Sequence, residues 1–73
     1  MVFDLVAGII ADSVHVDVNE ITEDTHFEDL GIDYIDLLDI VMAIEEQYDG
    51  IDIEIDDDIA SVGELVTAVE NCL

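Results

Sequence analysis

Hydrophobic side chains recur at helical spacing in three parts of this 73-residue chain. The first part covers residues 2–14, where apolar positions three and four residues apart are separated by Asp4 and Asp12. The second begins near Asp33 and ends at a turn dipeptide, Asp49-Gly50, and the third follows Ser61. These patterns predict three amphipathic helices, each with one face toward a shared core.

The two segments between these helices lack the helical rhythm. Residues 15–33 carry Asp, Asn and Thr side chains that bond back to the backbone, which favours turns and predicts a long ordered loop. Ile51, Ile53 and Ile55 alternate with acidic residues as in a strand, but the chain offers no second strand for pairing. We therefore expect an extended loop with inward-pointing isoleucines, followed by a short helical turn over 56–60.

Cap residues support the expected helix boundaries. The carboxylate of Asp33 can accept hydrogen bonds from the free amides that open the second helix. Ser61 and Glu64 have the spacing of a capping box, in which each side chain bonds to the backbone near the other. The expected fold class is all-α: one domain over 1–73, with three main helices, a short fourth helix, and a long loop after the first.

The charge of the chain narrows the classes of partner. It has 21 acidic residues, no Lys and no Arg, so its formal net charge is -21 at pH 7. Nucleic acid and anionic membrane surfaces would repel such a chain, and basic protein surfaces would attract it. No apolar run reaches the ~20 residues that span a bilayer, so membrane insertion is not expected. The single cysteine, Cys72, cannot form an intrachain disulfide, and we expect a cytoplasmic monomer.

Two consecutive segments resemble the signature of acyl carrier proteins. Residues 27–36 read F-E-D-L-G-I-D-Y-I-D, similar to the family's D-L-G-x-D-S-[LI]-D, and residues 37–46 read L-L-D-I-V-M-A-I-E-E, similar to its E-[LI]-V-M-x-[LI]-E-E. Residues 50–53 and 61–66 also resemble family segments. The resemblance implies an acyl-carrier-like helical bundle that carries acyl groups on 4'-phosphopantetheine in fatty acid or polyketide biosynthesis, and that is not an enzyme.

One position departs from the family pattern. Tyr34 stands where the family has the serine that carries 4'-phosphopantetheine, although Asp33 and Asp36 match on either side. A phenol oxygen lies several ångströms farther from the backbone than a serine oxygen, so a transferase site shaped for serine would misplace it. We expect either an engineered, blocked form of a carrier or a homologue that keeps the docking surface and has lost the covalent arm.

The resemblance also implies which residues meet partners and which surround an acyl chain. The partners would be basic surfaces of acyl-processing enzymes and of the phosphopantetheinyl transferase. The expected docking residues are Asp33, Asp36, Asp39, Glu45 and Glu46. The expected lining of the acyl pocket is Leu38, Val41, Ile53, Ile59 and Leu65.

Two alternatives come from other functional classes. The chain could be an acidic interaction domain without carrier function. Such a domain would be engineered or adapted to salt, and weak binding of Ca²⁺ or Mg²⁺ would stabilise it. Hard oxygen ligands gather at Asp52, Glu54, Asp56, Asp57 and Asp58, but this segment lacks the glycine and the distal glutamate of an EF-hand, so no dedicated metal site is expected. Catalysis is the weakest hypothesis, because Cys72, Ser13 and Ser61 have no cationic side chain beside them in sequence.

Overall fold

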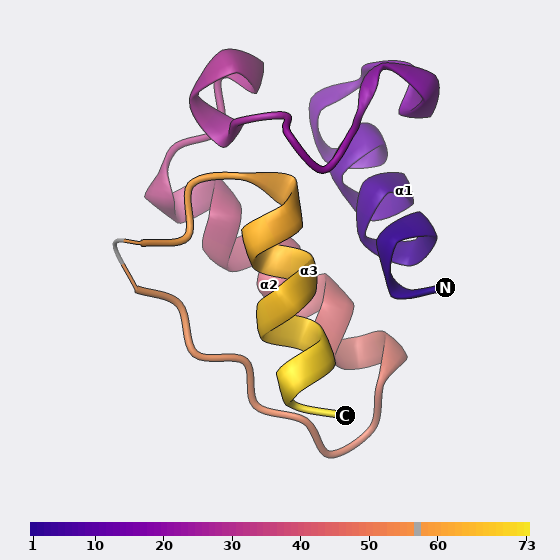
Figure 1. Cartoon of the computed structure of the whole chain (residues 1–73), viewed down its shortest axis with the longest axis vertical. Helices are drawn as coiled ribbons and strands as arrows, with labels where there is room; N and C mark the ends of the chain where they lie inside the picture. The colour runs from indigo at the N-terminus through magenta and orange to yellow at the C-terminus, as the bar shows by residue number, and fades with distance from the viewer. Residues whose placement is uncertain (57) are drawn as a thin grey trace.

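Three α-helices form the frame of the protein in this computed structural model, which describes residues 1–56 and 58–73. They are α1 (Val2–Val14), α2 (Tyr34–Gln47) and α3 (Val62–Asn71), as Figure 1 shows. Two 3₁₀ turns, η1 (Val18–Glu20) and η2 (Phe27–Leu30), interrupt the connection between α1 and α2. The described residues form no β-strand, so the predicted all-α class is confirmed.

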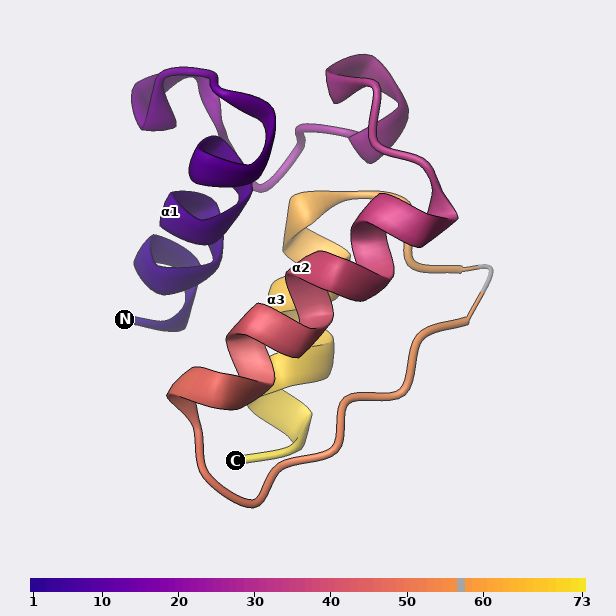
Figure 2. The same ribbon diagram turned by 180° about the vertical axis from the view of Figure 1, so that it is seen from behind.

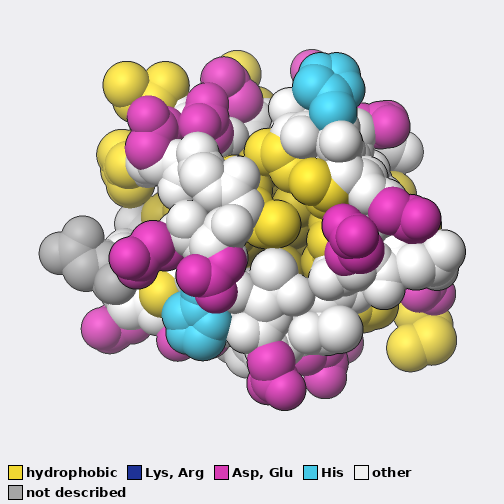
Figure 3. Space-filling model, turned by 90° about the horizontal axis from the view of Figure 1, so that it is seen from above, with side chains coloured by type: hydrophobic (Ala, Val, Ile, Leu, Met, Phe, Trp, Pro, Cys, Tyr) yellow, Lys and Arg dark blue, Asp and Glu magenta, His cyan; other side chains and the backbone are white. Residues whose placement is uncertain are grey.

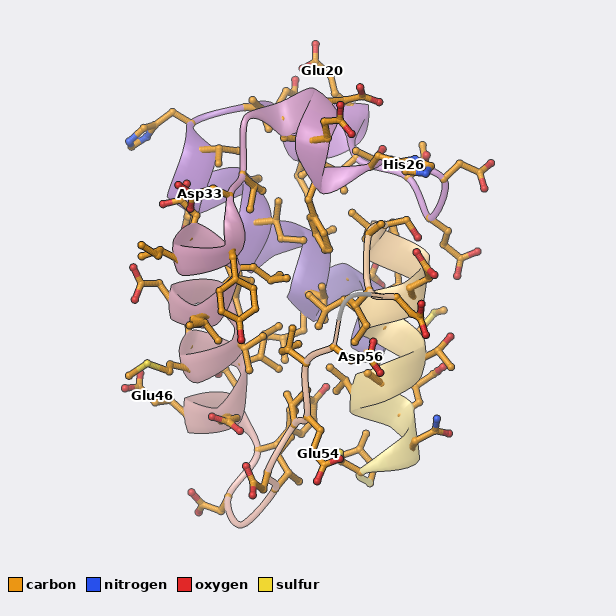
Figure 4. The ribbon with its side chains drawn as sticks, turned by 90° about the vertical axis from the view of Figure 1, so that its left-hand side faces the viewer. Glu20, His26, Asp33, Glu46, Glu54 and Asp56 are labelled. Carbon is orange, nitrogen blue, oxygen red and sulfur yellow. The ribbon has the colours of Figure 1, made fainter. Side chains whose placement is uncertain are left out.

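The hydrophobic core lies where the three helices meet. α1 packs against both α2 and α3, and the view from behind shows α1 beside the other two helices (Figure 2). In the side view, α2 and α3 stand on either side while the connection between them runs across the front (Figure 4). The largest fully buried side chains come from all three helices: Val6, Ile10, Ile40, Ile44, Val62, Leu65 and Val69.

The long loop between α1 and α2 is fastened to the start of α3. The amide of Phe27 donates to the carbonyl of Ala60 at 3.0 Å. In return, the amide of Gly63 donates to the carbonyl of Glu23 at 2.9 Å. A Cβ at position 63 would lie 2.9 Å from that carbonyl oxygen, so the close approach requires glycine. The loop is ordered, as predicted, because residues distant in sequence satisfy its backbone.

The connection between α2 and α3 is extended, as its isoleucine pattern predicted. Ile53 is buried, whereas Ile51 and Ile55 are partly buried against the core. Within the predicted short helix over 56–60, Asp57 lies outside the described residues. The described residues of that range form a turn rather than a helix, in which the amide of Ile59 donates to the carbonyl of Asp56 at 3.2 Å.

The two predicted helix caps are present. Asp33 Oδ1 accepts from the amide of Asp36 at 2.8 Å, and Asp36 Oδ2 accepts from the amide of Asp33 at 3.4 Å. At α3, Ser61 Oγ accepts from the amide of Glu64 at 3.3 Å. The returning contact differs in one detail, because Glu64 Oε1 accepts from the amide of Ala60 at 3.1 Å and from the Ser61 hydroxyl at 3.0 Å. Both helices therefore begin at fixed residues.

The cap of α3 predicts a pH-dependent stability. The amide of Ala60, and then the hydroxyl of Ser61, lower the pKa of the Glu64 carboxyl below its ordinary value. Since the folded-state pKa is the lower one, this carboxylate stabilises the fold above its unfolded-state pKa and loses that effect as pH falls through the folded-state pKa. Replacing Glu64 by Ala should therefore lower the denaturant midpoint at pH 7, and lower it less at pH 3.

The matched control for this prediction is Glu70→Ala, which removes the same charge from an exposed residue near the other end of α3. Urea unfolding of both variants at pH 7 and pH 3 separates the effect of losing the cap from the effect of reducing the net negative charge. A loss in Glu64→Ala that is equal at pH 7 and pH 3 would contradict the assigned role of the carboxylate.

Carboxylates are the only ionised side chains other than histidine that this sequence can place on the surface. Viewed from the end where the long loop crosses, carboxylates surround a central area in which hydrophobic side chains are visible (Figure 3). No Lys or Arg is available to pair with them. Within the described ranges, no helix has the length and hydrophobicity needed to cross a membrane.

Candidate functional site

The first residue of α2 is the exposed Tyr34, whose side chain is 59% accessible. The reciprocal hydrogen bonds between Asp33 and Asp36 hold the backbone on both sides of it. Tyr34 therefore projects from a helix start whose geometry is fixed by its neighbours rather than by its own side chain.

Exposed carboxylates lie along α2, beginning at its N-terminus. Asp33, Asp36, Asp39 and Glu46 are exposed, and Figure 4 shows Asp33 at the start of α2 and Glu46 near its end. Both labelled side chains point away from the body of the molecule (Figure 4). The exposed residues on this side are thus free to meet a partner.

Glu45 differs from the other carboxylates expected at the docking surface. It is partly buried, and its Oε2 accepts a 2.9 Å hydrogen bond from the amide of Ile53. This contact fixes the extended connection against α2. Glu45 therefore holds the loop in place, a role that helical spacing alone could not reveal because Ile53 is eight residues away, and its contact with a partner stays a prediction.

An exposed hydrophobic stripe runs beside these carboxylates. Ile35, Leu38 and Met42 occupy positions i, i+3 and i+7 of α2, and they are 69%, 38% and 60% accessible. Leu38 was expected to line the acyl pocket, and its exposure places it in this stripe, so its contact with an acyl chain stays a prediction. At about 100° per residue around the helix axis, Leu38 points in a direction closer to Ile35 and Met42 than to the buried Leu37. A helical projection of the sequence therefore already indicated that Leu38 is exposed.

A groove of about 240 Å³ opens beside the start of α2. Tyr34 and Leu37 of α2, together with Ile59 and Ala60 of the following connection, line it. The sequence interpretation did not place any long-loop residue in its lining, but Phe27 and Ile32 lie there too. Their hydrophobicity within a polar loop was the available signal, and the contacts of the loop with α3 bring them to the groove.

The other residues expected around an acyl chain lie deeper. Val41, Ile53 and Leu65 are buried in the core, with accessibilities of 4%, 6% and 0%. Ile59 lines the groove itself. An acyl chain that reached the deeper residues would have to separate side chains that are packed together in this structure.

Known proteins match nearly the whole chain. The family described as the phosphopantetheine attachment site matches residues 4–69. The chain is 42% identical over 74 aligned residues to an acyl carrier protein of Sulfurovum sp., covering 94% of this chain and 95% of that protein. It is 39% identical over 75 residues to one of Clostridium acetobutylicum, with 96% and 94% covered. The chain belongs to the acyl carrier protein family.

Membership in this family explains the helical architecture of the molecule and makes it a carrier rather than an enzyme. Acyl carrier proteins are carriers rather than enzymes, and their prosthetic group is 4'-phosphopantetheine. A relative from Streptococcus pneumoniae, also an acyl carrier protein, is 39% identical over 69 residues, which are 94% of this chain and 92% of that protein. The helical bundle is the one that the resemblance predicted.

Tyr34, at the position where the family resemblance expects the attachment serine, has a side chain that does not fit the prosthetic group. A phenol ring separates the oxygen of Tyr34 from the backbone, and the ring is rigid, so rotation cannot bring that oxygen to where a serine oxygen would lie. The 59% accessibility of the side chain shows that burial does not prevent modification. The mismatch is therefore one of reach and chemistry at position 34.

The acidic residues before α3 do not assemble a metal centre in the part of the chain that the structure describes. No group of three or more His, Cys, Asp or Glu side chains is arranged there to hold an ion. Asp56 Oδ1 instead accepts from the amide of Asp58 at 2.9 Å, and Asp57 lies outside the described residues.

Proposed function

We propose that this acyl carrier protein homologue docks through α2 on basic surfaces of enzymes of fatty acid or polyketide biosynthesis, without a phosphopantetheine arm at Tyr34. One observation carries the proposal: the exposed side of α2 combines carboxylates with a hydrophobic stripe. We call this surface the docking face. It consists of Asp33, Ile35, Asp36, Leu38, Asp39, Met42 and Glu46.

The composition of the docking face suits a reversible complex. Its carboxylates would steer a partner that carries Arg and Lys, since charge complementarity raises association rates and sets register. The exposed Ile35 and Met42 would supply the hydrophobic centre of the interface, which the carboxylates cannot provide. The proposed partners include acyl-processing enzymes and the phosphopantetheinyl transferase, met by a monomer in the cytoplasm.

A second candidate function rests on the carboxylates outside this face. Asp33, Asp36, Asp39 and Glu46 are four of the 21 acidic residues, so docking leaves most of the charge unexplained. An acidic interaction domain, adapted to salt or engineered and stabilised by Ca²⁺ or Mg²⁺, would account for the rest. The two candidates differ in whether the position of the charge matters for binding.

Neutralising two docking carboxylates should weaken binding more than neutralising two elsewhere. A broad-specificity phosphopantetheinyl transferase serves as the probe, with affinity measured by isothermal titration calorimetry. Asp39→Asn combined with Glu46→Gln should weaken binding about threefold to tenfold, since exposed ion pairs contribute roughly 0.2–1 kcal/mol each. The control, Asp4→Asn combined with Asp12→Asn, removes the same charge from exposed positions of α1.

The control should bind within about twofold of the unaltered chain, because screening at ~0.15 M salt limits the reach of distant charges to about 8 Å. Equal weakening by the two double variants would mean that net charge, rather than the docking face, controls binding. That result would favour the second candidate.

A further inference from the structure

We propose that Tyr34 is itself a binding residue: its ring enters the opening in which a partner enzyme, such as the phosphopantetheinyl transferase, receives the attachment serine of an ordinary carrier, and so blocks that opening to carriers that have a serine. This inference rests on the proposed docking through α2. It concerns Tyr34, the residue that does not fit the prosthetic group, and it involves no covalent step.

The position of the ring supports such a role. An enzyme that attaches the arm to a carrier must receive the attachment residue beside the surface on which the carrier docks. Tyr34 occupies the position from which an arm would start, and its side chain is mostly exposed. A docked partner would therefore place its opening directly over this ring.

The surroundings of the ring favour burial in a partner. Tyr34 lies one turn before Leu38 and next to Ile35, so it extends the hydrophobic stripe of the docking face to the start of α2. Tyrosine is enriched among the residues that dominate binding energy, because it buries a large ring with few rotatable bonds. The structure gives its hydroxyl no hydrogen-bond partner among the described residues.

The capping hydrogen bonds make the anchor rigid. Asp33 and Asp36 bond to each other's backbone amides and fix the first turn of α2, from which the ring projects. A side chain on a fixed backbone loses less entropy on binding than one on a mobile loop. The same carboxylates precede and follow Tyr34 in sequence at the start of α2, so the partner that fits has basic residues near a hydrophobic opening.

The test is competition for the loading of an ordinary carrier. The acyl carrier protein of Clostridium acetobutylicum is the substrate, coenzyme A is the donor, and the transferase is the probe used above. Loading is followed by mass spectrometry while the unaltered chain is added. We expect competitive inhibition, while the mass of the added chain stays unchanged.

Three variants assign the inhibition to the ring. Tyr34→Ala should raise the inhibition constant at least tenfold, whereas Tyr34→Phe should stay within about threefold because the ring remains. Val18→Ala removes an exposed hydrophobic side chain outside the docking face and should have no effect. Circular dichroism of each variant checks that the helices are intact.

The outcomes separate this inference from the proposed function. If Tyr34→Ala inhibits as strongly as the unaltered chain, but Asp39→Asn with Glu46→Gln does not, the domain docks without using the ring and the inference is wrong. If Tyr34→Phe loses inhibition as fully as Tyr34→Ala, burial of the ring is also excluded. If neither Tyr34→Ala nor the carboxylate variant weakens inhibition, both proposals are overturned.

Discussion

Replacing Tyr34 by Ser is expected to change a chain that receives no phosphopantetheine into one that is fully loaded. The serine oxygen would project from the first residue of α2, where the hydrogen bonds between Asp33 and Asp36 already set the backbone. Correct placement of a nucleophile can account for many orders of magnitude in rate, so a change from no detectable product to complete reaction is reasonable. The measurement is intact mass after incubation with coenzyme A and a broad-specificity phosphopantetheinyl transferase.

Tyr34→Ala is the matched control for this experiment. It removes the phenol but adds no hydroxyl, so any mass gain in that variant would come from Ser13, Ser61 or another residue. Loading of the unaltered chain at Tyr34 would show that the ring does not prevent attachment. Failure of Tyr34→Ser to load, with its helices intact, would count against the docking face instead.

The second large effect is a strong rise of thermal stability with salt. The chain has a net charge of -21 at pH 7 within dimensions of 29 × 24 × 19 Å, and it has no Lys or Arg to form ion pairs. The screening length falls from roughly 30 Å at 0.01 M salt to roughly 3 Å at 1 M, so repulsion across the whole molecule changes to repulsion between neighbours. For a domain of this size, 1 kcal/mol shifts the melting temperature by about 4–8 °C.

We therefore expect the melting temperature to rise by at least about 10 °C between 0.01 M and 1 M NaCl, a shift that corresponds to about 2 kcal/mol. Differential scanning calorimetry measures it. A variant with Asp12→Lys and Glu70→Lys should show a smaller rise, since both residues are exposed and lie on different helices. An unchanged melting temperature across this range would contradict the prediction.

Magnesium separates general screening from a defined cation site. If screening alone stabilises the fold, MgCl₂ should lose its additional effect in 1 M NaCl. Stabilisation by micromolar Mg²⁺ in 1 M NaCl would instead indicate a dedicated site and favour the second candidate function. The described residues, which contain no cluster of metal ligands, lead us to expect the first result.

The helices and their starting residues could be read from the chain because their signals are local. Asp33 and Ser61 act on amides three residues away, and hydrophobic spacing marks the face that each helix buries. The inward direction of Ile53 was likewise given by alternation in an extended segment. The family resemblance, also local in its motifs, located Tyr34 at the attachment position.

Contacts between distant residues were not visible in this way. Leu37 and Leu38 are adjacent and equally hydrophobic, yet Leu37 is buried beside the long loop, whereas Leu38 is exposed in the docking face. Glu45 resembles Glu46 in sequence, but the amide of Ile53 binds its carboxylate. The lining of the groove by Phe27 depends on hydrogen bonds between the long loop and the start of α3.

By itself, the sequence determined the all-α class, the helix caps and the excess of negative charge, because each depends on composition or on residues within one or two turns. The tertiary structure alone decided that Glu45 binds the connection between α2 and α3 and which residues surround the groove. That decision depends on how α1 and the two connections cover α2, and burial of this kind is a property of the packed helices rather than of any one segment.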